Sequence, residues 1–161
     1  PVFASAYNTL TFTAMGNSYV GIAQDVPAAN EIIMRIGPHR GKVKTITHAV
    51  ENLGAGADIA ARAIHAFNSD AWIIAARVVN QTTVAAGIND ANTCVVQLAT
   101  GAGTVATTTF NTTVAFPAAN ASFDMGAPNN VHALPGQVLT LAVTNGATAD
   151  PGTFLVEVDY V

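Results

Sequence analysis

The chain has 161 residues with a formal net charge of −4, and half of its residues are hydrophobic while only 10% are charged. Six basic residues give no overall positive field, which argues against general nucleic-acid binding, and no stretch reaches the ~18–20 apolar residues of a membrane span. The length fits one domain, or one domain with an arm. A surface with so little charge favours burial against other subunits; the alternative is that abundant Thr and Asn residues hydrate it.

The first 29 residues differ in composition from the rest of the chain. They mix aromatic residues, among them Phe3, Tyr7 and Phe12, with Thr, Asn, Ser and Gly, and they carry almost no charge. Two interpretations stay open: an extended arm that contacts a neighbouring subunit, or the first strand or two of the domain. The composition therefore divides the chain into an N-terminal segment, residues 1–29, and a β-domain, residues 30–161.

The β-domain is expected to open with a strand at residues 31–36, a loop bounded by Gly and Pro at residues 37–41, and a second strand at residues 42–51. In the second strand the apolar phase shifts between Val43 and Ile46, which allows a β-bulge. The chain's only cluster of basic residues consists of Arg35, Arg40, Lys42 and Lys44. This cluster either meets an acidic partner or forms the solvated turn and flanks of a hairpin.

The middle of the chain alternates strand and turn signals. Residues 58–67 are ambiguous, because Asp58 could cap a short helix, whereas alternate residues from Ile59 follow the period of a strand, which we favour. Residues 72–81 are apolar on both faces and predict a central strand with Trp72 in the core. The further expected elements are a strand at 93–100, a turn at 101–103, a Thr-rich β stretch at 104–116, and a long connection at 117–136 with a short strand at 122–125.

The C-terminal residues carry the clearest strand pattern. Residues 137–144 and 153–161 are strand-like runs that flank a turn-forming loop. Alternate residues from Phe154 to Tyr160 fall on one face, which is the period-2 pattern of a half-buried antiparallel strand. The chain thus offers seven to nine strands and little helix, and its long connection suits Greek-key crossings. The sequence predicts an all-β fold: a single jelly-roll-like β-sandwich with an N-terminal extended arm.

Residues that could carry catalysis are sparse. The four histidines lack metal-ligand spacings such as HxH or HxxxH. Cys94 lies in an apolar strand-like run with no nearby histidine, which predicts a buried thiol rather than a nucleophile. The ten acidic residues nominate no catalytic pair. We therefore expect no enzyme activity, no metal site and no cofactor.

Three stretches carry a resemblance to a known group of proteins. They are the strand opening Gly41-Lys-Val-Lys-Thr-Ile, the run Gly136-Gln-Val-Leu-Thr-Leu-Ala-Val, and the ending Asp150-Pro-Gly-Thr-Phe-Leu-Val-Glu-Val-Asp-Tyr-Val. With these features, residues 41–161 resemble the small β-sandwich decoration (cement) proteins of tailed bacteriophage heads. The likeness is one of pattern and composition, and it includes no catalytic motif.

The resemblance implies a non-enzymatic virion protein on the capsid surface, made in the host cytoplasm. It would bind the major capsid protein, stabilise the expanded head and form a homotrimer, without direct contact to nucleic acid or membrane. The aromatic N-terminal segment and the basic cluster suggest the capsid and subunit contacts: Phe3, Tyr7, Phe12, Arg35, Arg40, Lys42 and Lys44. The alternatives are a carbohydrate-binding module and a fibre-, tail- or neck-associated β-sandwich of a virion, because jelly rolls host many functions.

Overall fold

The computed structural model describes residues 22–23, 34–35, 42–52, 54–81 and 86–161. Backbone contacts divide the chain into two units, Pro1–Gly41 and Lys42–Val161. In the first unit, β1 (Ile22–Ala23) pairs antiparallel with β2 (Met34–Arg35). All other described elements belong to the second unit.

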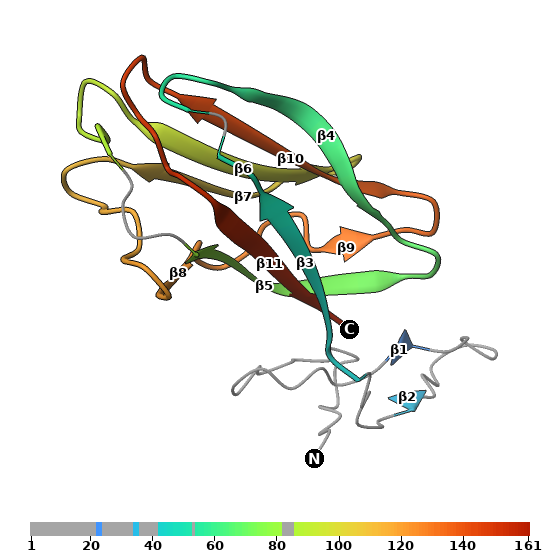
Figure 1. The fold of residues 1–161 in the computed structure, drawn as a ribbon. Helices are drawn as coiled ribbons and strands as arrows, with labels where there is room; N and C mark the ends of the chain where they lie inside the picture. The colour runs from blue at the N-terminus through green and yellow to red at the C-terminus, as the bar shows by residue number, and fades with distance from the viewer. Residues whose placement is uncertain (1–21, 24–33, 36–41, 53, 82–85) are drawn as a thin grey trace, which may run out of the picture. The chain divides into compact units, whose positions relative to one another are not determined.

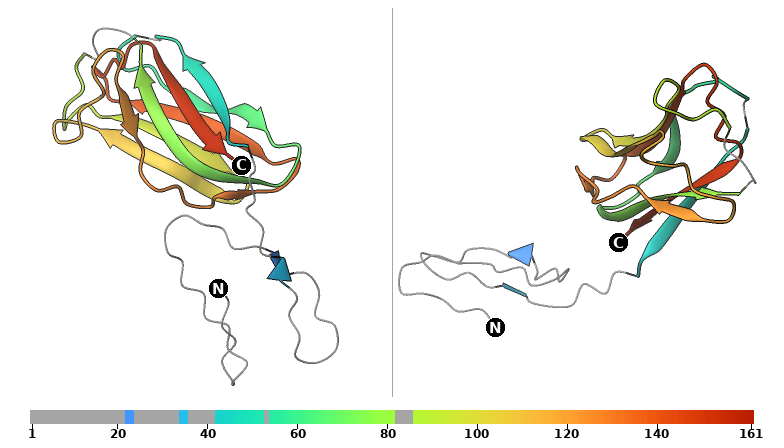
Figure 2. Two further views of the ribbon diagram at one scale, coloured as in Figure 1. Left: turned by 90° about the horizontal axis from the view of Figure 1, so that it is seen from below. Right: turned by 90° about the vertical axis from the view of Figure 1, so that its left-hand side faces the viewer.

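The second unit consists of two antiparallel sheets that pack face to face (Figures 1 and 2). One sheet has the order β4-β10-β6-β7, and the other has the order β3-β11-β5-β8, with β9 also pairing with β5. No helix occurs among the described residues, so none there is long and apolar enough to cross a membrane. The strands are β3 (Lys44–Val50), β4 (Ile59–Ala66), β5 (Ala71–Asn80), β6 (Cys94–Thr100), β7 (Gly103–Phe110), β8 (Ser122–Asp124), β9 (His132–Ala133), β10 (Val138–Asn145) and β11 (Phe154–Tyr160).

The strand order is that of a jelly roll. Strands from the two ends of the unit pair in a nested series: β3 with β11, β4 with β10, β5 with β8 and β9, and β6 with β7. Successive pairs lie in alternate sheets, so the chain behaves as one long antiparallel ribbon that is rolled up. The expected jelly-roll-like β-sandwich is confirmed.

Alternating apolar residues on the inner faces of both sheets fill the core. In β10 the inward residues Leu139, Leu141 and Val143 are at most 1% exposed, and in β11 the residues from Phe154 to Val158 at the inward positions are fully buried. Burial of apolar surface contributes about 25 cal/mol per Å². The core therefore fixes which face of each strand looks outward, since a slip of one residue would reverse every side chain.

Several expected elements need correction. β3 pairs with β11 without any register shift from Lys44 to Val50, so the β-bulge that the apolar phase allowed does not occur within β3; Val43 is exposed and Ile46 is buried. The segment from Asp58 is a strand, β4, as favoured, but two register shifts against β10 break its alternation. β7 stops at Phe110 rather than at residue 116, because the Asn111 side-chain oxygen accepts backbone hydrogen bonds that form a turn. The two-residue β9 was not foreseen.

Candidate functional site

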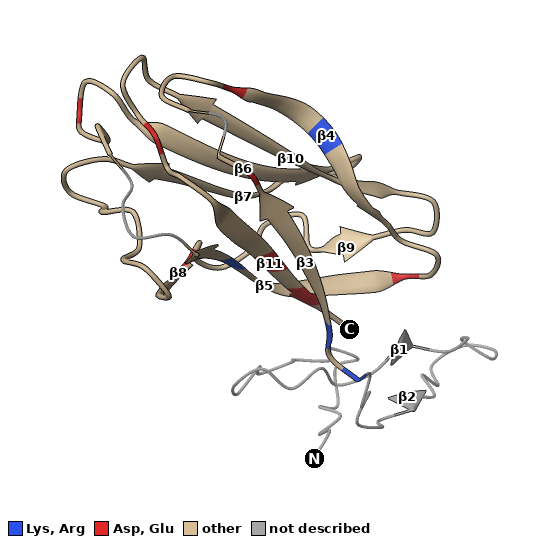
Figure 3. Ribbon diagram, in the orientation of Figure 1, with Lys and Arg blue, Asp and Glu red and all other residues tan. Residues whose placement is uncertain are grey.

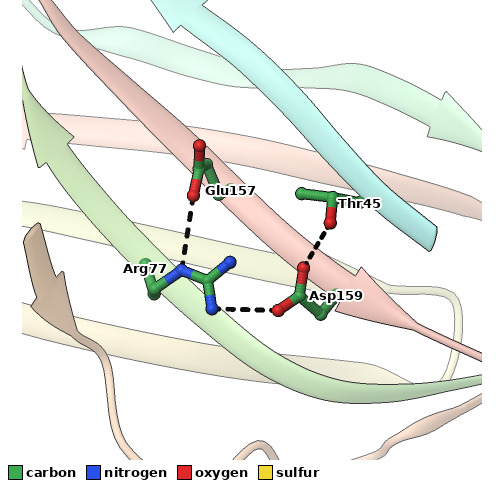
Figure 4. A network of polar contacts seen from close by, with 4 residues as sticks. All are labelled: Thr45, Arg77, Glu157 and Asp159. Carbon is green, nitrogen blue, oxygen red and sulfur yellow. Dashed lines mark hydrogen bonds and ion pairs between the residues drawn. The ribbon is translucent and has the colours of Figure 1, made fainter. Parts of the chain in front are cut away.

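The outward face of strands β3, β11 and β5 carries a network of polar side chains (Figure 4). Arg77 of β5 donates from Nε to Glu157 Oε2 at 3.3 Å, and its Nη1 lies 2.9 Å from Asp159 Oδ2. The hydroxyl of Thr45 on β3 donates to Asp159 Oδ1 at 2.6 Å. Glu157 and Asp159 are two residues apart on β11, so they point to the same face and share one cation between them.

Hydrogen bonding sets the charge state of this network. The hydrogen bond from Thr45 and the bond and charge of Arg77 lower the pKa of Asp159, against the effect of desolvation. The hydrogen bond to Asp159, with a further bond to Glu157, raises the pKa of Arg77. A carboxyl group with a lowered pKa is a poor proton donor at neutral pH. The network is therefore suited to joining three strands and not to general acid catalysis.

An apolar row crosses the same face next to this network. We use the term apolar row for Val43, Val161 and Trp72, which are 53%, 38% and 41% exposed. Trp72 and Val161 exchange both backbone hydrogen bonds, at 2.9 and 3.0 Å, and Val43 directly precedes Lys44, the partner of Tyr160. The row thus consists of the residue before β3, the residue after β11, and Trp72 on β5. Ile74 and Leu134 are both about half exposed, and these five are the exposed large hydrophobic side chains of the described residues.

Trp72 is not a core residue, contrary to the sequence prediction. Its indole stacks on the imidazole of His132 with ring centroids 4.6 Å apart and an interplanar angle of 14°. His132 Nε2 in turn lies 3.4 Å from Asp70 Oδ1. The neighbouring Ile73 is the buried residue, at 2% exposure. Because residues 72–81 are apolar on both faces, no alternation of apolar and polar residues could distinguish Trp72 from Ile73.

Only part of the expected contact set lies in the described structure. Lys42 and Lys44 are both exposed, and the Nζ of Lys44 lies 5.7 Å from the centre of the Tyr160 ring. Arg35 lies on β2, but its side chain is outside the described part. Three aromatic residues and one arginine of the expected set also lie outside the described residues: Phe3, Tyr7, Phe12 and Arg40.

The remaining chemistry-bearing residues serve local structure. Asp150 accepts the backbone N–H of Gly152 at 3.0 Å, and Asp90 accepts both the N–H and the hydroxyl of Thr112. Among the described residues no group of three or more His, Cys, Asp or Glu is placed to hold a metal ion. Cys94 is fully buried in β6, as expected, and burial raises the pKa of its thiol to about 12.

Comparison with known proteins adds little to this picture. No known family matches the sequence, and no curated protein matches it. One solved structure, "Structure of infectious bursal disease virus Gx strain", matches with a TM-score of 0.37 and 17% identity; the match covers 93% of this chain and 39% of that chain. The chain therefore spans well under half the length of that protein, and the jelly-roll assignment rests on the strand order above.

Proposed function

We propose that this chain is a structural, non-enzymatic protein of a virus particle: a decoration protein that binds the shell of an assembled bacteriophage capsid. The observation that carries the proposal is the apolar row. A Trp and two Val residues that stay exposed on one face of a rigid sandwich provide the apolar centre of a protein interface, where aromatic residues contribute most of the binding energy.

The strands that carry the row support the same role, because two backbone hydrogen bonds hold Trp72 and Val161 side by side. A rigid strand scaffold loses little conformational entropy on binding. The row would contact the major capsid protein, and a homotrimer would place three such contacts around one site.

The test is co-sedimentation of the purified full-length protein with expanded empty capsids of the phage that encodes it. We expect saturable binding, a higher capsid melting temperature, and a trimer mass by light scattering. Trp72→Ser should weaken binding at least tenfold, while Gln97→Ala, an exposed change on the other sheet, should not. Binding that is unaffected by Trp72→Ser would show that the row is not part of the interface. Failure of the wild-type protein to bind would overturn the capsid role.

A second candidate function is carbohydrate binding, because the exposed indole of Trp72 lies beside the pair His132 and Asp70. Sugar sites commonly combine an aromatic ring with hydrogen-bonding side chains near it. This function predicts a glycan-array signal that Trp72→Ser abolishes. A glycan signal from protein that ignores capsids would favour this candidate over the first.

A further inference from the structure

The uncompensated positive charge of the sandwich lies at one of its edges. β3 and β4 are the end strands of their sheets, and they meet where Nη2 of Arg62 on β4 lies 3.0 Å from Nε2 of His48 on β3. The fourth residue before His48 is Lys44, which lies over the Tyr160 ring, and that ring also contacts His65 of β4. We call Lys44, His48 and Arg62 the basic edge.

The cations of the second unit differ in whether a carboxylate lies close to them. Figure 3 shows Lys and Arg only on β4, on β5 and at the start of β3 within this unit. Arg77 of β5 is paired with two carboxylates, whereas neither Lys44 nor Arg62 forms an ion pair with any described residue. Burial, and after it the charge of Arg62, lowers the pKa of His48, so its neutral ring accepts a hydrogen bond from Arg62 and the cations of the edge are Lys44 and Arg62. The basic edge thus presents cations that lack an anionic partner within the described residues.

The same edge exposes backbone hydrogen-bonding groups. Val161, directly after β11, exchanges both backbone hydrogen bonds with Trp72 of β5, so in an antiparallel ladder Tyr160 and every second residue before it bond to β3. On β3 this leaves the N–H and C=O groups of Thr45, Thr47 and Ala49 facing away from β11, and all three residues are exposed. No other described strand pairs with this side of β3. An edge of this kind accepts an additional strand.

We propose that the basic edge binds an acidic, extended segment of a partner protein, which adds to β3 as a further strand. Every second side chain of that strand would lie on the same face of the sheet as Lys44 and His48, where Arg62 of β4 also reaches. Lys44 and His48 are four residues apart on one face of β3, about 13 Å at 3.3 Å per residue, and the guanidinium of Arg62 lies against His48. The two cations, Lys44 and Arg62, therefore match carboxylates at positions i and i+4 of the segment recognised. This inference does not depend on the capsid role, because it follows from the edge alone.

The test uses the full-length protein and the fluorescent peptide Thr-Glu-Val-Thr-Val-Glu-Thr, followed by anisotropy at low salt. We expect saturable binding that falls at least tenfold when both Glu residues are replaced by Gln, and at least tenfold in the double variant Lys44→Gln, Arg62→Gln. Lys42→Gln, which changes an exposed cation ahead of β3, is the matched control and should change affinity less than about twofold. A peptide with N-methylated central residues should not bind, because strand addition needs its amide groups.

Each other outcome overturns part of the proposal. Equal binding of the Gln peptide would show that the carboxylates are not recognised. Undiminished binding of the N-methylated peptide would show that the peptide does not add to β3 as a strand. If no peptide binds at millimolar concentration, the proposal fails, and the cations of the basic edge act only to keep this edge from pairing with other chains.

Discussion

The guanidinium group of Arg77 lies 2.9 Å from the carboxylate of Asp159, diagonally across the β5–β11 pair. The residue directly opposite Arg77 is Glu157, and the same guanidinium reaches it as well. One cation therefore separates two carboxylates that would otherwise face each other on one side of β11. This arrangement joins β11 to its neighbour β5 on the outward face, and loss of Arg77 would leave both carboxylates without their cation.

Replacing Arg77 with Met should lower the free energy of unfolding by about 1 kcal/mol at pH 7. The substitution removes the cation and leaves Glu157 and Asp159 as unpaired neighbours of like charge. Urea denaturation measures the effect. Arg62→Met removes an exposed arginine without a carboxylate partner and should stay within about 0.5 kcal/mol of wild type. Equal effects of the two substitutions would show that the network adds nothing beyond ordinary surface packing.

The network should also make stability depend on pH in the acidic range. Because the pKa of Asp159 is lowered in the folded state, its contribution is complete above the pKa of the unfolded chain and is lost as the pH falls through the folded-state pKa. Wild type should exceed Asp159→Asn in stability at pH 7, and the difference should shrink steadily below about pH 4. Unfolding curves at pH 7, 4 and 2.5 would test this. A difference that stays constant over this range would contradict the lowered pKa.

The hydroxyl of Thr45 is the largest single cause of the lowered pKa of Asp159. Thr45→Val keeps the shape and the strand propensity of the side chain but removes the donor at 2.6 Å. We expect a loss of about 1 kcal/mol and a higher pKa for Asp159, measurable by NMR titration of the carboxyl carbon. In a double-mutant cycle with Asp159→Ala, which removes the acceptor, the losses should not add, since both changes remove the same bond. Additive losses would show that the hydroxyl acts elsewhere.

The sequence was sufficient to predict the jelly roll because apolar residues recur at every second position along the core strands. Phe154 to Tyr160 alternate cleanly, and on β11 the structure buries Phe154, Val156 and Val158 and partly buries Tyr160. Two features escaped prediction for physical reasons. Trp72 lies in a run that is apolar on both faces, so its outward position depends on the register with β11 and β9. Arg62 is exposed and reaches His48 of the other sheet, and the two register shifts of β4 against β10 interrupt the simple alternation from which its position could have been predicted.

The candidate site was harder to predict than the fold. The network of Thr45, Arg77 and Asp159 joins residues from three strands that are far apart in the sequence, and no local spacing announces it. The apolar row likewise forms only because the order of strands in the sheet brings Val43, Val161 and Trp72 together. The sequence did nominate Lys42 and Lys44, but it offered no sign that Lys44 and Arg62 lie at one edge of the sandwich.

Cys94 should be unreactive in the folded protein. Its side chain is fully buried, and desolvation raises the pKa of the thiol to about 12, so almost no thiolate forms at pH 8. Labelling with a disulfide reagent should therefore follow unfolding, with the full thiol signal appearing only in denaturant. Rapid labelling under native conditions would show that β6 opens readily. Cys94→Ala, by contrast, tests packing and should cost about 1 kcal/mol or more, because it leaves a small cavity.

Gly87 should be the least replaceable glycine in the loops that join the strands. Its φ angle is +68°, and a Cβ there would lie 2.0 Å from the backbone oxygen of Thr148. This contact belongs to a tight junction of two loops, in which Ala86 and Asp150 exchange backbone hydrogen bonds at 2.8 Å. Neither backbone can move away without breaking that junction.

We therefore expect Gly87→Ala to lower the free energy of unfolding by more than about 2 kcal/mol, from backbone strain and overlap together. Gly126→Ala is the matched control, because Gly126 has a φ of +89° but no atom within 4 Å of the added Cβ. It should cost only about 1 kcal/mol, the conformational part alone. Thermal and urea unfolding of both variants would give the two values. If Gly87→Ala is no more destabilising than Gly126→Ala, the junction between the loops yields easily, and the two loops do not form a rigid end of the sandwich.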